Sequence, residues 1–393
     1  MFSRTLTKSF KLACLVLLCF ICLSAGSLAF AETLPQASQQ PQVDASGVSA
    51  SSNATTSTLQ AASQNGWVTE ADGTRHWYEN GIIAADKAFY DPSTDAWYWA
   101  DADGSIATNK DVFIPVSNED RSSGKWVRFD EQSRMVKGED YRYDAWYYFD
   151  ETTGEMAKGF TPLYAYPKWV FYDYVTGRML YGEQCIDGNW YYLTPGTGAV
   201  DYEWAWIPTA DKWVYYDPVT GIMYHGSHWV DGKLRYFDNV TGKVCTKDEI
   251  INKLFSVVST TYGANLDCAG ELGAAGGSVC PYGPCMSYVW WCFYHAGLGN
   301  FLCDGAITGW PHDNSNWYAA RGRFDMFPQV GDIAFFRFPA QWADDMGVPT
   351  DHAGIVIGTS NDSVLVADAT YEGIGLRWYD LGVCAGFAHP YYD

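Results

Sequence analysis

The sequence predicts an all-β solenoid of hairpin repeats followed by an α+β domain in which a helix packs on an antiparallel sheet. Three observations predict this division. A unit of about 20 residues, rich in Trp, Tyr and Gly, recurs across 66–248. The recurrence then stops, and 249–393 contains one strongly apolar helical segment and several apolar strands. About 145 residues suffice for a single core of this kind.

The first residues have the layout of a secretory signal. Three basic residues precede an apolar stretch at 12–23, and Ala29-Phe30-Ala31 offers small residues for cleavage, so 1–31 is predicted to be a signal peptide. The apolar stretch is shorter than the ~20 residues that a membrane-spanning helix needs. Residues 32–65 are mostly Ser, Ala, Gln and Thr, which predicts a disordered linker.

The composition limits the possible partners. A formal net charge of -21 repels phosphate backbones and anionic lipid surfaces, so neither nucleic acid nor a membrane is expected as a partner. Aromatic residues make up 17% of the chain, with 18 Trp and 28 Tyr, which is more than ordinary packing requires. Because aromatic faces attract cations and offer flat apolar area, neutral or cationic ligands are expected.

The repeat unit reads as a β-hairpin. It is clearest in KWVFYDYVTGRMLYG (168–182) and KWVYYDPVTGIMYHG (212–226), where an alternating strand leads to a Thr-Gly turn and then to Met and a closing Gly. One hairpin cannot bury its apolar face alone, so neighbouring hairpins must stack.

These repeats resemble the choline-binding and glucan-binding cell-wall repeat families. The resemblance implies that aromatic side chains form cages for a quaternary ammonium, such as the choline of teichoic acid, or platforms for another wall polysaccharide. The alternative, that the rings only pack a thin solenoid, stays open. The candidate ligand-binding aromatics are Trp146, Tyr148, Trp169, Tyr172, Trp190, Trp213 and Tyr216.

The C-terminal segment places a cysteine at the start of a helix. A short first helix is expected over 251–258. Apolar residues then recur at helical spacing from Cys285 to Ala296, with Pro284 before them and Gly297 after. At a helix N-terminus, unpaired backbone N–H groups and the helix dipole stabilise a thiolate, which is the nucleophilic form of cysteine.

Apolar strands are expected at 331–338, 352–357 and 363–367. His352 begins the second of these strands, and Asp368 follows the third. Cys285, His352 and Asp368 therefore supply a nucleophile, a base and an acid that orients the base, which is the logic of a papain-like triad.

The same segment resembles the cysteine, histidine-dependent amidohydrolase/peptidase family, known as CHAP, and more distantly the NlpC-type peptidases. The similar motifs are PCMSYVWWCFYHAGL (284–298), PQVGDIAFF (328–336), DHAGIVIG (351–358) and SVLVADAT (363–370). The resemblance implies a papain-like fold, Cys285 as nucleophile, His352 as general base and acid, and Asp368 as the residue that holds the imidazole.

The resemblance also implies a secreted, cell-wall-associated hydrolase that cleaves an amide in peptidoglycan and needs no cofactor. The bond is either the N-acetylmuramoyl-L-alanine amide or one in the peptide stem or cross-bridge. Two other functions stay open: a catalytically silent wall-binding adhesin, and a cysteine peptidase that acts on host protein.

Other residues compete for these roles. Cys268 lies in an Asp-Cys-Ala-Gly sequence like the NlpC nucleophile, but the Gly-rich residues after it predict a loop, and a disulfide is the favoured role for this cysteine. His295 lies about 15 Å along the helix from Cys285, too far to act on it. Tyr282, or alternatively Tyr262, is the candidate oxyanion donor beside the backbone N–H of Cys285.

The remaining cysteines suggest disulfides rather than a metal site. Eight of the 11 cysteines follow the signal region, and some are expected to pair, while Cys285 and Cys292 stay free. The gaps between Cys268, Cys280, Cys285 and Cys292 lack the close pairs typical of zinc sites, so no metal is predicted.

Overall fold

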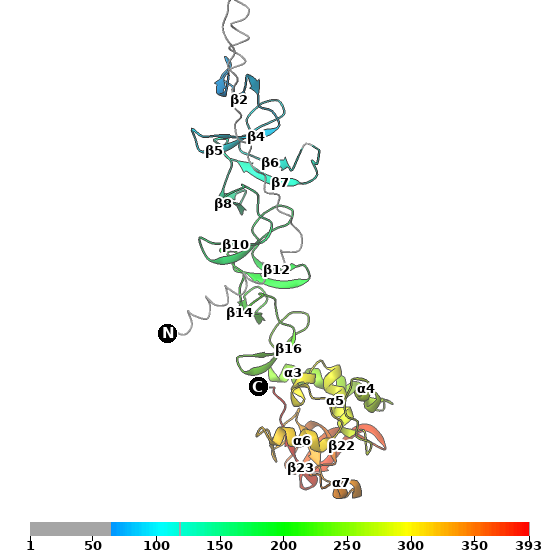
Figure 1. The fold of residues 1–393 in the computed structure, drawn as a ribbon. Helices are drawn as coiled ribbons and strands as arrows, with labels where there is room; N and C mark the ends of the chain where they lie inside the picture. The colour runs from blue at the N-terminus through cyan, green and yellow to red at the C-terminus, as the bar shows by residue number, and fades with distance from the viewer. Residues whose placement is uncertain (1–63, 118, 393) are drawn as a thin grey trace, which may run out of the picture. The chain divides into compact units, whose positions relative to one another are not determined.

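The computed structural model describes residues 64–117 and 119–392, which fold as two units (Figure 1). One unit extends to Ile186 and includes Tyr192–Asp201; the other comprises Asp187–Tyr191 and Tyr202–Asp393. The predicted signal peptide and nearly all of the predicted linker lie outside the described residues. Within the described ranges, no helix has the length and apolar character needed to cross a membrane.

The repeats form antiparallel hairpins, as predicted, and Figure 1 shows them in succession from blue to green. The first sheet has three strands, β1 (Gly66–Thr69), β2 (Arg75–Glu79) and β3 (Ile82–Ile83). Seven two-stranded sheets follow: β4 (Lys87–Asp91) with β5 (Ala96–Ala100), β6 (Lys110–Pro115) with β7 (Gly124–Phe129), β8 (Gly138–Arg142) with β9 (Ala145–Phe149), β10 (Gly159–Leu163) with β11 (Lys168–Tyr172), β12 (Gly182–Ile186) with β13 (Asn189–Leu193), β14 (Glu203–Ile207) with β15 (Lys212–Tyr216), and β16 (Gly226–Val230) with β17 (Lys233–Phe237).

The recurring turn and the Met after it connect successive hairpins. In the turn, Asp173 accepts hydrogen bonds from the backbone N–H of Thr176 at 2.6 Å and from its hydroxyl at 2.8 Å. After the turn, the N–H of Met179 donates to the carbonyl of Trp146 in the preceding hairpin at 2.8 Å. Met156 makes the same bond to the carbonyl of Trp126 at 2.7 Å. The repeat sequence therefore encodes both the hairpin and its attachment to the hairpin before it.

Strand alternation divides the predicted ligand-binding aromatics between two faces. Trp169 and Tyr172 are three residues apart in one strand, so their side chains point to opposite faces. Tyr172 and Tyr216 are fully buried, and the prediction that they bind a ligand at the surface is wrong. The other five predicted aromatics are half-buried or exposed: Trp146, Tyr148, Trp169, Trp190 and Trp213.

The second unit contains the predicted α+β domain, with its helices gathered around one sheet (Figure 1). The sheet order is β18-β23-β19-β20-β21-β22, and all neighbours are antiparallel. Its strands are β18 (Phe324–Asp325), β19 (Ile333–Phe336), β20 (His352–Thr359), β21 (Ser363–Thr370), β22 (Gly373–Asp380) and β23 (Cys384–Ala388). The helices are α3 (Lys247–Thr260), α4 (Cys268–Ala274), α5 (Cys285–His295), α6 (Pro311–Ala319) and α7 (Gln341–Met346), with short 3-10 turns η1 (Gly299–Phe301), η2 (Cys303–Gly305) and η3 (Leu381–Val383).

Helix α5 is the centre of the main core. Eight of its eleven residues are buried, and they share one apolar cluster with α3, α4 and one face of the sheet. That face carries Phe335, Ile355 and Ala367, whereas the alternate residues Phe336, Val356 and Val366 form a smaller cluster on the opposite face. Because α5 is buried along most of its length, the position of Cys285 at its first residue is fixed by packing.

Three local expectations were wrong. The Gly-rich segment after Asp267 is helical, because Asp267 caps it through the N–H of Gly270 at 2.9 Å and because Leu272 is fully buried. Strand β21 continues to Thr370, so Asp368 lies inside the strand instead of after it. All eight cysteines in the described ranges are free, so the expected disulfides, including that of Cys268, do not form there.

The contact between neighbouring hairpins predicts a specific loss of stability. Gly177 has φ +71°, and a Cβ atom there would lie 2.5 Å from the sulfur of buried Met156 in the preceding hairpin. Gly182 has a similar φ of +74°, but a Cβ atom there would meet nothing within 4 Å. Gly177→Ala should therefore lower the free energy of unfolding by about 1–3 kcal/mol more than Gly182→Ala does, because only Gly177→Ala overpacks a contact. Thermal unfolding of the mature chain compares them, and equal losses would contradict the contact.

Candidate active site

Cys285 lies at the N-terminus of α5, in a cleft of about 230 Å³. Pro284 precedes the helix without a side-chain cap, and its carbonyl accepts the N–H of Tyr288 at 2.8 Å. The backbone N–H groups of the first helical turn have no partners within the helix, so they can stabilise negative charge at this point. Cys285 is 4% exposed and borders the cleft, so a substrate in the cleft can reach it.

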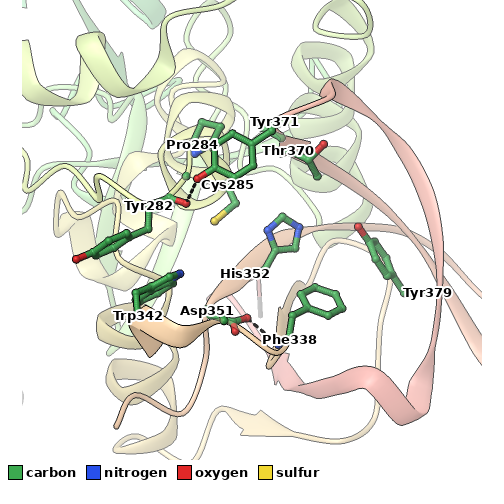
Figure 2. Close-up of a pocket in the computed structure, with 13 residues that line it drawn as sticks. Tyr282, Pro284, Cys285, Phe338, Trp342, Asp351, His352, Thr370, Tyr371 and Tyr379 are labelled. Carbon is green, nitrogen blue, oxygen red and sulfur yellow. Dashed lines mark hydrogen bonds between the residues drawn. The ribbon is translucent and has the colours of Figure 1, made fainter. Parts of the chain in front are cut away.

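His352, the first residue of β20, faces Cys285 across the cleft (Figure 2). Its Nε2 lies 2.7 Å from Oδ2 of Asp368, which leaves Nδ1 for the thiol. Burial lowers the pKa of His352, but its hydrogen bonds with Asp368 and Cys285 outweigh burial and raise the pKa to about 9. The imidazole is therefore protonated at neutral pH when it is paired with these two groups.

Asp368 is fully buried and has three partners from two neighbouring strands. Besides His352, it accepts a hydrogen bond from the hydroxyl of Tyr379 at 2.6 Å and one from the guanidinium of Arg377. Burial raises the pKa of Asp368, but the hydrogen bonds from His352 and Tyr379 bring it below its ordinary value. Asp368 is therefore ionised at neutral pH, and its three donors offset the cost of burying a carboxylate.

The register of the sheet explains this arrangement. Arg377 and Tyr379 are two residues apart in β22, so both side chains point to the face on which Asp368 lies. Gly354, two residues after His352 in β20, leaves that face open: a Cβ atom there would lie 2.4 Å from Cγ1 of Val366 and 2.8 Å from both the Cβ of Asp368 and the carbonyl oxygen of Ala367. The Gly in the sequence DHAGIVIG thus makes room for the carboxylate.

The predicted oxyanion donor does not face the nucleophile. The ring of Tyr282 stacks on Trp342 with centroids 4.6 Å apart and planes 4° from parallel, and Figure 2 shows its hydroxyl directed away from Cys285. The carbonyl of Tyr282 accepts the hydroxyl of Tyr371 at 2.6 Å. This stacked position does not fit the role predicted for Tyr282, and the alternative, Tyr262, does not line the cleft.

The competing residues lie elsewhere. Burial raises the pKa of Cys268 to about 12, which keeps it a neutral thiol. His295 pairs with Glu271 at 2.8 Å. None of these residues lines the cleft. In the described part of the chain, no group of three or more His, Cys, Asp or Glu side chains is arranged to hold a metal ion.

Sequence reasoning missed Arg377, Tyr379, Trp342 and Tyr371. The first two could have been found from GIGLRWYD (373–380), which follows a turn and can pair with the strand that carries Asp368. Trp342 lies in a short helix between β19 and β20, and nothing in its local sequence indicates that it borders the cleft.

The space at Gly354 predicts a loss of thiol reactivity. Gly354→Ala should displace Asp368 and slow alkylation of Cys285 by iodoacetamide at pH 7 by about 10- to 100-fold, because a misplaced carboxylate no longer holds the imidazole of His352 beside the thiol. Gly358→Ala in the same strand is the matched control, since its Cβ atom would make only an ordinary contact of 3.7 Å with Leu365. Equal rates for the two variants would show that the space at Gly354 is not needed.

Comparisons with known proteins agree with this division of the chain. The family model of the CHAP domain matches residues 275–370, and that of the choline-binding repeat matches residues 119–159. No curated protein sequence is similar enough to this chain to count as a relative.

Several solved structures resemble part of the chain. Choline binding protein F from Streptococcus pneumoniae, in the presence of a peptidoglycan analogue, is 22% identical over 44% of this chain and 56% of its own, with a TM-score of 0.37. The choline-binding domain of CbpL from Streptococcus pneumoniae is 22% identical over 47% of this chain and 88% of its own, with a TM-score of 0.35. The modular autolysin LytC from Streptococcus pneumoniae is 18% identical over 46% of this chain and 48% of its own, with a TM-score of 0.25.

This chain thus spans little more than half the length of the first of these structures. Its C-terminal residues match the CHAP model across the motifs that carry Cys285, His352 and Asp368, and its hairpins include a match to the choline-binding repeat. Residues 275–370 of this chain thus match the CHAP domain, and residues 119–159 match the choline-binding repeat.

Proposed function

We propose that this protein is a secreted, cell-wall-associated hydrolase that cleaves an amide bond in peptidoglycan with Cys285 as its nucleophile. The observation that carries the proposal is the series of contacts from Cys285 at the start of α5, through His352, to the buried carboxylate of Asp368. A thiol, an imidazole and a carboxylate in this order can attack a carbonyl and move the proton that the reaction requires.

The reaction follows from the charges of these groups. The Cys285 thiolate adds to the amide carbonyl, and the oxyanion accepts a hydrogen bond from the backbone N–H of Cys285. The imidazolium of His352 gives its proton to the leaving amine, the carbon–nitrogen bond breaks, and a thioester remains. Water then gives a proton to His352 and its oxygen to the acyl carbon, which releases a carboxylic acid and restores the pair. Asp368 keeps the imidazole oriented and stabilises its protonated form.

The hairpin array would hold the enzyme on the wall through choline-bearing polymer or another wall polysaccharide. Exposed tryptophans on three of the hairpins support this role, since Trp146, Trp190 and Trp213 are 38%, 40% and 50% exposed. Cations already stack on rings of the array: the guanidinium of Arg75 lies 4.2 Å from the ring centroid of Trp67. Several weak sites on one array gain avidity along a polymer that repeats the same group.

Release of new amino groups from purified peptidoglycan by residues 32–393 tests the proposal. Wild type should release them, and Cys285→Ala should lose at least about 10³-fold in rate, because no other group in the cleft can form the thioester. The inactive variant should still cosediment with the walls, because its repeats are unchanged. Circular dichroism checks that the variant is folded.

Two results would contradict the proposal. Release by Cys285→Ala at the wild-type rate would exclude Cys285 as the nucleophile. No release by wild type from walls of several compositions, with cosedimentation intact, would indicate a binding protein without hydrolase activity.

A further inference from the structure

The cleft around Cys285 is lined mainly by aromatic rings. They come from the loop before α5, from the segment after β19 with α7, from the turn after β21 and from β22. The five aromatic side chains besides His352 are Tyr282, Phe338, Trp342, Tyr371 and Tyr379. Figure 2 shows Tyr282 and Trp342 together on one side of the nucleophile and Tyr379 on the other.

The rings of Tyr282 and Trp342 stack face to face, so the pair offers a ligand an outer ring face. Their rings are 4° from parallel at 4.6 Å, and Trp310 packs edge-on against both, with centroids 6.0 Å from Tyr282 and 6.4 Å from Trp342. The indole N–H of Trp310 donates to the hydroxyl of Ser278 at 3.2 Å, which fixes this supporting ring. Tyr282 is 42% exposed, so the stacked pair is braced from behind and open to a ligand.

The backbone beneath this surface is tied to the catalytic sheet. The hydroxyl of Tyr371, in the turn between β21 and β22, donates to the carbonyl of Tyr282 at 2.6 Å. Tyr282 is three residues before Cys285, so this bond holds the stacked pair at a fixed position relative to the nucleophile. A ring-shaped group that lies on the pair would share one cleft with the thiol.

The charges of the cleft favour a neutral group at this position. None of the thirteen residues that line the cleft is Lys or Arg. The carboxylate among them, Asp351, has a side chain that is 3% exposed and is bonded by Arg337 and by the N–H of Phe338. Arg377, near the cleft, is engaged by Asp368 and by Thr370 at 3.0 Å. The one cationic side chain of the lining is His352, which is engaged by Asp368 and Cys285, so no further cation is present to pair with the free carboxylate of a stem peptide. An aromatic ring face suits the apolar face of a pyranose.

We propose that Tyr282 and Trp342 form a subsite for a neutral sugar ring, so that the amide cut is the one that joins the sugar's lactyl group to the first residue of the peptide stem. The inference rests on the proposed function and adds the identity of the bond. The Cys285 thiolate attacks the lactyl carbonyl, the carbon–nitrogen bond to the stem breaks, and His352 protonates the released α-amine. Water then hydrolyses the thioester, which leaves a muramic acid with a free lactyl carboxylate and the regenerated thiol.

Two soluble substrates separate the sugar from the peptide. One is a disaccharide–tetrapeptide, and the other is a cross-linked peptide dimer of the same composition without sugar. Wild type should release a tetrapeptide with a free α-amine from the first substrate and leave the second intact, as identified by mass.

Trp342→Ala should lower kcat/KM on the disaccharide–tetrapeptide by about tenfold or more, because the sugar loses its stacking surface. Trp378→Ala is the matched control, since Trp378 is a 59% exposed Trp of β22 that does not line the cleft. The rate of Cys285 alkylation should stay at the wild-type value in both variants, which shows that the catalytic groups are in place. Tyr282→Leu, tested in the same way, covers the case in which Trp342→Ala does not fold.

The possible failures are distinguishable. Cys285-dependent cleavage of the sugar-free dimer at a rate comparable to that of the disaccharide–tetrapeptide would overturn the sugar subsite and leave the hydrolase standing. Unchanged kcat/KM in both Trp342→Ala and Tyr282→Leu would overturn the assignment of these rings. Absence of Cys285-dependent cleavage of either substrate and of whole peptidoglycan would overturn the proposed function and this inference with it.

Discussion

The buried carboxylate of Asp368 is the constraint on which the arrangement of the site depends. An ionised carboxylate with no exposure is costly unless donors surround it, and here three donors from β20 and β22 do so. To bring these donors to Asp368, three adjacent strands must be aligned, with His352 at the start of β20. Residue 354 must also lack a side chain, because a Cβ atom there would clash with β21. Helix α5, buried on the opposite face of the same sheet, then brings Cys285 to the imidazole.

The hairpin array is stabilised by contacts between hairpins that are neighbours in the sequence. A hairpin of two five-residue strands has too little apolar surface to be stable alone. Each unit therefore forms a backbone hydrogen bond to the unit before it, and its buried Met packs against the turn glycine of the unit after it. The aromatic residues divide between this packing and the surface according to strand alternation. Half-exposed tryptophans at the same point of several hairpins give a repeated surface, which suits a polymer that repeats one chemical group.

The sequence predicts a residue's position well where a chemically reactive side chain lies within a short segment of clear helical or strand periodicity. Cys285 was predictable because Pro284, a helical apolar pattern and Gly297 define the start and end of its helix. His352 and Asp368 were predictable because each occurs at a polar break in an apolar strand.

The errors arose where the answer depended on register or on tertiary contact. Tyr172 and Tyr216 are predicted ligand-binding aromatics that the structure buries, because each is three residues from the Trp of its strand and so lies on the opposite face. The helix after Asp267 was missed because the burial of Leu272 outweighs the low helix propensity of glycine. Trp342 could not be predicted from sequence, because a six-residue helix far from Cys285 in the chain comes to lie against Tyr282 only in the folded domain.

The central claim is that Asp368 keeps the imidazole of His352 protonated beside Cys285. Titration of the His352 ring by NMR, with its signal assigned by loss in His352→Gln, tests this claim without any substrate. A pKa near 9 in wild type and a clear decrease in Asp368→Asn are expected, because removal of the negative charge destabilises the imidazolium. A pKa close to the ordinary value of 6.5 in wild type, or no change in Asp368→Asn, would contradict it.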